Sequence, residues 1–234
     1  MLTSALRSGF RVTGLGLVLL AAPVMAESEQ DPWEGFNRSM FTFNENVDRY
    51  AVKPFAQGYR YVTPDLAEQG VSNVFDNIGD VGNLLNNLLQ LKFEAAGKSF
   101  ARLTFNTTFG LAGLVDVATP MGIEVHNEDF GQTLGFWGVG SGPYLVLPFF
   151  GPSTVRDGVS MPVDWVADPV GYAGHVPTRN SLYGLRLADT RSRLLKAEQI
   201  VSGDKYSFLR DAYLQRREYQ INDGAVEVKY DSDF

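Results

Sequence analysis

The chain has 234 residues, a formal net charge of −7 and no cysteine. The acidic balance argues against a nucleic-acid-binding protein and against polybasic docking on anionic lipid, because both need a basic surface. Without cysteine the sequence holds no disulfide, no thiolate metal site, no cysteine nucleophile and no lipid-modified N-terminal cysteine. Hydrophobic residues make up 44% and charged residues 20%, so the chain can bury a sizeable core and wholesale disorder is excluded.

The first 26 residues are typical of a secretory signal peptide. Arg7 and Arg11 provide a basic start, residues 12–22 form a short apolar run, and small residues follow Pro23. We predict cleavage after Ala26, a single helical domain over residues 27–224 and a polar tail over residues 225–234. The alternative is an uncleaved N-terminal anchor, although the run is shorter than the ~20 apolar residues of a transmembrane helix.

The first helix of the mature chain is predicted to start at residues 31–34 (DPWE), with Asp31 as its cap. Apolar side chains then recur every three or four residues, which is the spacing of one helix face. They are Phe36, Met40, Phe43, Val47 and Tyr50. Pro54 is expected to end this helix, and residues 63–65 (TPD) are expected to begin the next one.

Residues 73–91 predict a helix with two contrasting stripes. The apolar stripe consists of Val74, Ile78, Val81, Leu85, Leu88 and Leu89. The opposite stripe consists of Asn73, Asp76, Asn77, Asp80, Asn83, Asn87 and Gln90. Its side chains are mostly uncharged amides, whereas solvated helix faces usually carry lysine and glutamate. Gly79 and Gly82 interrupt this helix and either weaken it or allow close packing.

The rest of the chain predicts further helices around one irregular region. Residues 93–108 predict a helix closed by Gly110, and two more are expected over residues 181–201 and 204–221. Glycine, proline and aromatic residues dominate residues 110–175, and this density is expected to exclude a long regular helix there. Within that region residues 144–147 (YLVL) predict a hairpin strand or an ordered loop. The fold class is therefore mainly α, with one Gly/Pro-rich hairpin or loop segment.

No pattern indicates a catalytic centre, a cofactor or a metal. Residues 97–99 (GKS) resemble the end of a phosphate-binding loop, but they lie in a predicted helix instead of following a strand. A nucleophile elbow centred on Ser141 lacks both of its flanking glycines. His126 and His175 have no ligand-spaced partner, so structural roles are favoured for both. We predict that the protein is not an enzyme.

Several motifs together resemble the MlaA/VacJ family. Residues 31–38 (DPWEGFNR) resemble its opening motif, and residues 130–135 (FGQTLG) and 142–148 (GPYLVLP) resemble its central hallmark. Residues 151–153 (GPS), followed by Arg156 and Asp157, come next in the same order. Each motif is weak alone, but their order and spacing match from about residue 31 to residue 224.

The resemblance implies a ring of amphipathic helices around a central channel, placed in the inner leaflet of the Gram-negative outer membrane. It implies passive intermembrane phospholipid transport, in which mislocalised phospholipid leaves the outer leaflet and passes to a periplasmic carrier of the MlaC type. Lipid asymmetry is thereby maintained. It also implies association with a trimeric porin. Many relatives carry a lipidated cysteine that this chain lacks, so we expect attachment through apolar helix faces or porin contacts.

A lipid conduit has to offer apolar and polar surfaces together. Roughly 30 methylenes of a phospholipid cost on the order of 20 kcal/mol or more in water, and its head group resists the bilayer core. Neutral amides can donate to phosphate and accept from ammonium. We therefore expect amides to line the channel while Leu85, Leu88 and Leu89 face lipid or porin. The expected lining residues are Asn44, Asn73, Asn77, Asn83, Asn87 and Gln90; the alternative is that these amides merely face water.

The Gly/Pro-rich segment is a candidate gate, because glycine permits backbone change. The gate hypothesis concerns Gly138, Gly140, Gly142, Pro143, Tyr144, Leu147 and Phe149. The alternative is a rigid turn stiffened by its prolines.

Three other functions stay open from the sequence. A soluble periplasmic lipid carrier would enclose an apolar pocket and fractionate with the periplasm. A phospholipase would need a catalytic triad, which the sequence does not provide. A purely structural envelope protein would leave transport intact when deleted.

Overall fold

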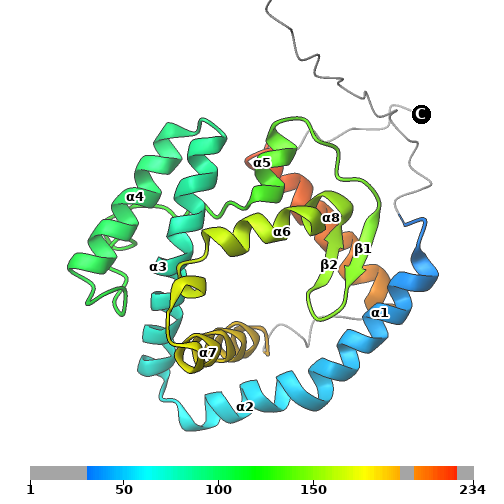
Figure 1. Ribbon diagram of the computed structural model, residues 1–234, viewed down its shortest axis with the longest axis horizontal. Coiled ribbons are helices and arrows are strands. Elements are labelled where there is room, and N and C mark those ends of the chain that lie inside the picture. The colour runs from blue at the N-terminus through cyan, green and yellow to red at the C-terminus, as the bar shows by residue number, and fades with distance from the viewer. Residues whose placement is uncertain (1–30, 196–202, 226–234) are drawn as a thin grey trace, which may run out of the picture.

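The computed structural model describes residues 31–195 and 203–225. Its helices follow one another around an open centre, and a β-hairpin lies between α1 and α6 (Figure 1). The mainly α fold class is confirmed. The predicted signal peptide, residues 1–26, lies outside the described residues, as does nearly all of the predicted tail.

One side of the ring is a continuous helical segment that we call the belt. It runs from α1 (Glu34–Val47) through the π-helical turn η1 (Asp48–Val52) into α2 (Lys53–Val62). The prediction that Pro54 ends the first helix is wrong. In the π turn the Lys53 amide donates to the Asp48 carbonyl, so Pro54 falls in the first turn of α2, where a missing N–H is tolerated.

The π turn also keeps one exposed apolar stripe in phase along the belt. The stripe consists of Phe36, Phe43, Tyr50, Phe55 and Val62, all exposed and spaced by seven, seven, five and seven residues. In a regular α-helix a five-residue step rotates about 140° away from the previous side chain. The i→i+5 bonding of the π turn absorbs the additional residue. The belt therefore presents the same apolar face from end to end.

The predicted helix starting at residues 63–65 is confirmed as α3 (Asp65–Leu89), which contains the whole two-striped segment. It packs along α4 (Phe93–Thr108), as Figure 1 shows, and the bounds of α4 match the prediction. A loop then folds back against these helices. The Asn106 Oδ1 holds it by accepting the amides of Val117 (2.9 Å) and Ala118 (3.0 Å).

Residues 130–172 form two helices, a hairpin and a short 3₁₀ turn. They are α5 (Phe130–Phe136), β1 (Tyr144–Leu147), β2 (Gly151–Thr154), α6 (Val155–Ala167) and η2 (Pro169–Tyr172). The predicted hairpin is confirmed, with Tyr144 opposite Thr154 in an antiparallel pair. The expectation that residues 110–175 exclude a regular helix is wrong for α6. Most of the glycines and prolines precede it, although Gly158 and Pro162 lie inside it, and Thr154 caps it by accepting the Asp157 amide at 3.2 Å.

The two C-terminal helices are α7 (Val176–Leu194) and α8 (Lys205–Ile221). The predicted bounds of α8 are confirmed to within one residue. The structure begins α7 five residues earlier than predicted, with Pro177 in its first turn. Residues 196–201, also predicted to be helical, lie outside the described residues.

Two asparagines of α1 close the free edge of the hairpin. Asn37 accepts the Val146 amide at 2.8 Å and donates to the Tyr144 carbonyl at 3.1 Å. Asn44, seven residues later, accepts the Phe149 amide at 2.7 Å and donates to the Leu147 carbonyl at 2.9 Å. Each carboxamide bonds β1 as a neighbouring strand would, so α1 both holds the hairpin and protects its edge.

Asp31, predicted to cap the first helix, has a different role. The helix starts at Glu34, and Trp33 occupies the cap position. The Asp31 carboxylate accepts instead from the Asn37 amide at 2.7 Å and from the Tyr206 hydroxyl of α8. The residue therefore joins the two ends of the described chain.

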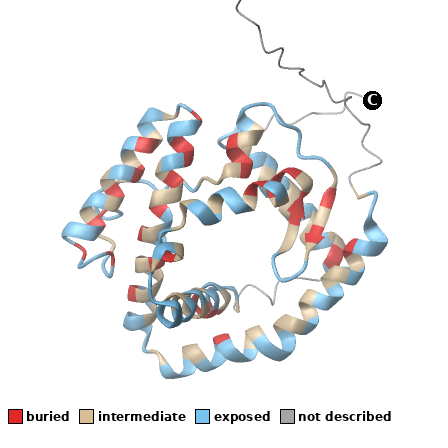
Figure 2. Cartoon of the chain, viewed as in Figure 1, coloured by how far each residue is buried: buried red, intermediate tan, exposed pale blue. Residues whose placement is uncertain are grey.

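The distribution of polar and apolar side chains is inverted relative to a water-soluble protein. Among the described residues 19 buried side chains are polar or charged, against nine that are hydrophobic. Buried positions are scattered over the ring instead of gathering in one centre (Figure 2). Large apolar side chains are exposed along most helices, including Phe100, Phe109, Trp165 and Val166. Such an exterior fits an apolar environment, although no described helix is long and apolar enough to cross a membrane.

Candidate functional site: a cavity inside the ring

The main cavity has a volume of about 860 Å³ and is enclosed by α3, α6, α7 and α8. This size falls within the ~300–1,000 Å³ of small-molecule sites. Its apolar lining includes Phe75, Ile78, Met161, Trp165 and Leu194. Its charged lining includes six carboxylates and four guanidinium groups. The cavity thus offers hydrocarbon-compatible and head-group-compatible surfaces side by side.

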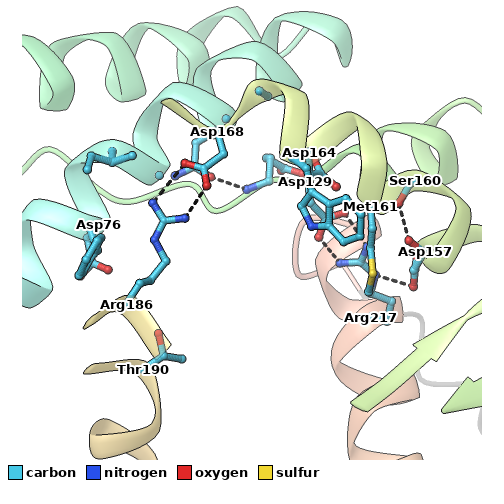
Figure 3. Close-up of a pocket in the computed structure, with 18 of the residues that line it drawn as sticks. Asp76, Asp129, Asp157, Ser160, Met161, Asp164, Asp168, Arg186, Thr190 and Arg217 are labelled. Atoms are coloured by element: carbon cyan, nitrogen blue, oxygen red, sulfur yellow. Dashed lines mark hydrogen bonds and ion pairs between the residues drawn. The ribbon is translucent and has the colours of Figure 1, made fainter. Parts of the chain in front are cut away.

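Arg217 of α8 organises one wall of the cavity. Its guanidinium binds Asp129 through two bonds of 2.5 and 2.6 Å, and Asp157 through a bond of 2.9 Å. Tyr213, one turn earlier, donates at 2.7 Å to the same Asp157 oxygen as Arg217. We call these four residues the Arg217 cluster (Figure 3). The cluster fastens α8 to the start of α5 and to α6.

The charges of this cluster are set by two opposing effects. Burial acts to raise the pKa of Asp129 and of Asp157, but the hydrogen bonds and charge of Arg217 outweigh it. Both pKa values therefore lie below the ordinary aspartate value. Both carboxylates are ionised at neutral pH and are already paired, which makes the cluster a structural element of the wall.

The opposite wall carries a second arginine pair. Arg186 of α7 binds Asp168 at the end of α6 through bonds of 2.7 and 3.2 Å. Its guanidinium carbon also lies 5.1 Å from the centre of the Phe75 ring of α3. Figure 3 shows Arg186 and Arg217 on different sides of the open space, with Thr190 one turn along α7 from Arg186. Two fixed positive groups therefore border the cavity.

Asp164 of α6 differs from the other carboxylates of the lining. Burial raises the pKa of Asp164 to about 6, and the nearby charge of Asp129 acts in the same direction. The Phe130 amide, which donates to its carboxylate at 2.9 Å, opposes this shift only in part. Asp164 is thus a lining carboxylate that approaches neutrality in mildly acidic solution.

The amide stripe packs inside the protein, against α4, the segment after it and α5. Asn77, Asn83, Asn87 and Gln90 are at most 7% exposed. Their amides donate within the protein: Asn77 to Thr107, Asn83 to Asp80, Asn87 to the Asn83 carbonyl, and Gln90 to Glu128 and Thr133. Asn73 donates to the Leu114 carbonyl, and Asn44 is engaged by the hairpin. Of the six predicted lining residues, the main cavity includes Asn83.

The predicted outward side chains Leu85, Leu88 and Leu89 are 43–44% exposed. Buried amides are stabilised more by hydrogen bonds to protein partners than by a water-filled lining. This face of α3 therefore packs against the rest of the protein. The other side of α3 borders the cavity, and there the lining includes Gly79 and Gly82.

The predicted gate residues fall into two groups. Gly138, Gly140 and Gly142 are exposed, and at Gly138 and Gly142 φ is positive, so a loop conformation favouring glycine precedes the hairpin. Tyr144 is buried in β1, and Pro143 and Leu147 are half-buried. Phe149, at the hairpin tip, is 72% exposed and has φ of 67°. The loop and the tip are exposed, whereas the strand between them is fixed.

Sequence reasoning missed Arg186, Arg217 and Asp164. The partners of Arg217 lie 60 and 88 positions away in the chain, and the partner of Arg186 lies 18 positions away. No local spacing reveals such pairs. The only available signal was Asp157 within the family motif, which does not identify its partner.

The ring and its cavity agree with the comparisons with known proteins. Residues 29–220 match the family model described as MlaA lipoprotein. The chain belongs to the MlaA family. It is 34% identical over 230 residues to the intermembrane phospholipid transport system lipoprotein MlaA of Escherichia coli (strain K12), covering 91% of this chain and 88% of that protein.

Two further comparisons place it within the same family. The MlaA lipoprotein of Haemophilus influenzae is 32% identical over 210 residues, covering 84% of this chain and 81% of the relative. A solved structure from work on the structural basis for maintenance of bacterial outer membrane lipid asymmetry matches with a TM-score of 0.71 at 34% identity. That match covers 82% of this chain and 99% of the other, so the two structures share most of their fold.

Proposed function

We propose that this chain carries phospholipid passively between membranes and so maintains the lipid asymmetry of the outer membrane. In this proposal it removes mislocalised phospholipid from the outer leaflet and hands it to a periplasmic carrier of the MlaC type. The observation that carries the proposal is the mixed cavity inside a ring with an apolar exterior. The names of the E. coli and H. influenzae relatives support the same function.

The two surfaces of the cavity match the two parts of a phospholipid. Met161 and Trp165 offer apolar contact to acyl chains, and Arg186 offers a charged donor to a phosphate. A lipid inside the ring would keep its hydrocarbon away from water, which is the main free-energy cost of moving it.

The proposed step is passive and is not enzymatic. The GKS segment, residues 97–99, lies within α4 and not after a strand, so it does not have the context of a nucleotide-binding loop. Transfer would then follow the difference in lipid affinity between this protein and its carrier. Against a phospholipase, neither His126 nor His175 lines the main cavity, and the Ser160 hydroxyl donates to the Asp157 carbonyl.

We place the protein in the outer membrane at its periplasmic face, exported by a signal peptide and held without a lipidated cysteine. The exposed apolar side chains of α4, α6 and the belt support attachment through the protein surface. About 300 Å² of inserted apolar area at about 25 cal/mol per Å² corresponds to roughly 7 kcal/mol. A trimeric porin is the proposed second partner, and Leu85, Leu88 and Leu89 are available to contact it or lipid.

The hairpin tip and the loop before it are the proposed gate. Asn44 tethers the tip at Phe149, so Asn44→Ala would release it while Asn37 still holds β1. We expect the released tip to change the lipid transfer rate severalfold relative to Asn46→Ala, a control at an exposed position of the same helix. Equal rates in the two variants would mean that the segment is a rigid turn.

A cysteine introduced into the cavity tests the transport proposal, because the chain contains no cysteine of its own. Thr190→Cys places a thiol in the lining of α7, and a bulky maleimide then obstructs the cavity. Ser181→Cys, an exposed position on the same helix outside the lining, is the matched control. The measurement is transfer of fluorescent phospholipid from proteoliposomes to the periplasmic carrier.

We expect modification of Thr190→Cys to reduce transfer at least tenfold and modification of Ser181→Cys to leave it unchanged. Full transfer through a blocked cavity would overturn the proposed route. Recovery of the protein in the periplasmic fraction with one bound lipid would favour the soluble carrier, and release of fatty acid would favour the phospholipase.

A further inference from the structure

A second, smaller cavity lies beside α3, and we call it the side chamber. Its volume is about 400 Å³, and it is enclosed by α3, α4 and the loop that follows α4. Its lining is strongly polar and includes Asn73, Asn77, Asp80, Arg102, Asn106 and Asp116. A space of this size inside a small helical protein needs an explanation, since protein interiors are normally close-packed.

Two buried polar atoms of the side chamber have no hydrogen-bond partner. Asn77 is 6% exposed, and its Oδ1 accepts no bond although its amide nitrogen donates to Thr107. Arg102 is 4% exposed; its Nη atoms donate to Thr119, Ile123 and Asp116, whereas its Nε donates no bond and lies 3.4 Å from the Asp80 Oδ2 atom. One acceptor atom and one donor atom are thus without a hydrogen bond in the same chamber. A ligand that satisfies both has to supply a donor and an acceptor.

The charges of the side chamber favour a ligand that also carries a positive group. Three carboxylates line it, from Asp76, Asp80 and Asp116, against the two guanidinium groups of Arg102 and Arg193. Burial raises the pKa of Asp80 because the nearby Arg102 only partly offsets the cost of burying the ionised carboxylate. An incoming ammonium would supply compensating charge, whereas an anionic ligand without a cation would add to the excess.

Gly79 lies between the side chamber and the main cavity, whose linings also share Phe75, Asp76, Asn83 and Arg193. It lines both spaces, whereas Gly82, one turn later on α3, lines the main cavity and is outside the chamber lining. A Cβ atom built at either glycine meets nothing within 4 Å. At Gly70 in the same helix it would lie 3.3 Å from Leu114. Close packing therefore does not account for Gly79 or Gly82, although glycine weakens a helix interior.

We propose that the side chamber binds the head group of a zwitterionic phospholipid, a phosphate joined to an ammonium group, which enters from the main cavity past Gly79. The phosphate lies toward Arg102, and the ammonium lies toward Asn77 and the carboxylates. This inference rests on the proposed function, because it assigns part of the lipid to a place beside the proposed route. It also makes Gly79 a specificity-determining position, distinct from Gly82.

A pair of leucine substitutions tests the assignment. Gly79→Leu fills the entrance to the side chamber, and Gly82→Leu adds the same volume to the main cavity alone; both have open space at Cβ and a better helix former. Gly97→Leu, at an exposed position of α4 with equally open space, is the control outside both cavities. Transfer of phosphatidylethanolamine and of phosphatidylglycerol is measured separately from otherwise identical vesicles.

We expect the wild type to transfer phosphatidylethanolamine severalfold faster than phosphatidylglycerol. Gly79→Leu should bring this ratio close to one, whereas Gly82→Leu should slow both lipids and keep the ratio. Wild-type transfer without preference, or the same ratio in Gly79→Leu and wild type, overturns the inference while the proposed function stands. Absence of any wild-type transfer would instead overturn the proposed function.

A soluble probe tests the side chamber without transport. Glycerophosphoethanolamine lacks acyl chains, and at about ten times its dissociation constant a specific ligand raises Tm by roughly 3 °C. We expect this shift in the wild type and in Gly82→Leu, and its loss in Gly79→Leu. Glycerophosphoglycerol should give a smaller shift in the wild type and in Gly82→Leu. A shift that Gly79→Leu retains in full would contradict entry past Gly79.

Discussion

Two walls of the main cavity are built from opposite chemistry. On the α8 side the Arg217 guanidinium is shared between Asp129 and Asp157, so each of these three charges has a partner at 2.5–2.9 Å. On the α3 side the lining includes Gly79 and Gly82, where no side chain projects at all. The first wall therefore holds the ring together, and the second leaves space for a ligand.

The difference shows that charge at a cavity wall is a poor guide to ligand contact. Arg217 gives up much of its attraction for a third anion, because all three of its nitrogens already donate to carboxylates. The glycine surface of α3 lies next to the side chamber, where the Arg102 Nε and the Asn77 Oδ1 have no hydrogen-bond partner and keep their capacity to bind. Stability and transport should accordingly respond to different walls.

Removal of Arg217 is expected to give the largest effect. Arg217→Met leaves the Asp129 carboxylate buried without its cation and the Asp157 carboxylate with Arg156 alone, at a cost of about 3–5 kcal/mol. Arg216→Met removes a neighbouring, exposed arginine of the same cavity and should cost less than about 0.5 kcal/mol. Thermal unfolding in detergent measures both. Equal stabilities would mean that the α8 wall is not structural.

Asp164 provides a test of intermediate size that depends on pH. Its folded pKa of about 6 exceeds the unfolded value, so the folded state binds the proton more tightly, and Asp164 lowers stability as pH rises from about 4 to about 6. Asp129 and Asp157 act in the opposite sense: their lowered pKa values add stability that is lost as pH falls below about 4.

Asp164→Asn removes the titration while its side chain can still accept the Phe130 amide. The variant should be more stable than wild type by about 1–2 kcal/mol at pH 7 and equally stable near pH 4. Unfolding midpoints between pH 4 and pH 7 provide the measurement, with Asp211→Asn on the exposed face of α8 as control. A constant difference across this range would exclude Asp164 as its source.

Alanine on the α3 wall is expected to give the smallest effect on stability. Gly82→Ala has open space for its Cβ, so only helix propensity changes, and the folded state should gain about 0.5–1 kcal/mol. Gly70→Ala, whose Cβ would press on Leu114, is the contrasting control and should gain less or lose stability. Destabilisation by Gly82→Ala would show that α3 packs against something at this point after all.

The sequence predicted the helices well and the direction of their faces less well. The amphipathic spacing located α3 and α4, because a 3.6-residue period does not depend on the partner of a helix. Which stripe of α3 faces the cavity does depend on the partner. The amides find their partners in α4 and in the segment before α5: Asn77 donates to Thr107 and Asn83 accepts the Glu128 amide, 30 and 45 positions away in the chain.

The site itself was predictable only in part. Asn73, Asn77 and Asn83 were singled out as unusual amides, and all three line the side chamber. Gly79 was noticed as a weak point of the helix, but its open surroundings became apparent only from the arrangement of α3 in the ring. The Arg217 cluster unites α5, α6 and α8, so no local pattern contains it.

The π-helical turn of the belt has a consequence for how such chains vary in length. Without Ala51, Tyr50 and Phe55 would be four residues apart, which is one ordinary α-helical turn, so the apolar stripe would keep its direction. Pro54 would then fall inside a regular helix and would have to change as well. A chain one residue shorter can therefore build the same outward face, and a gap between two aligned relatives at this point can lie within a helix and not in a loop.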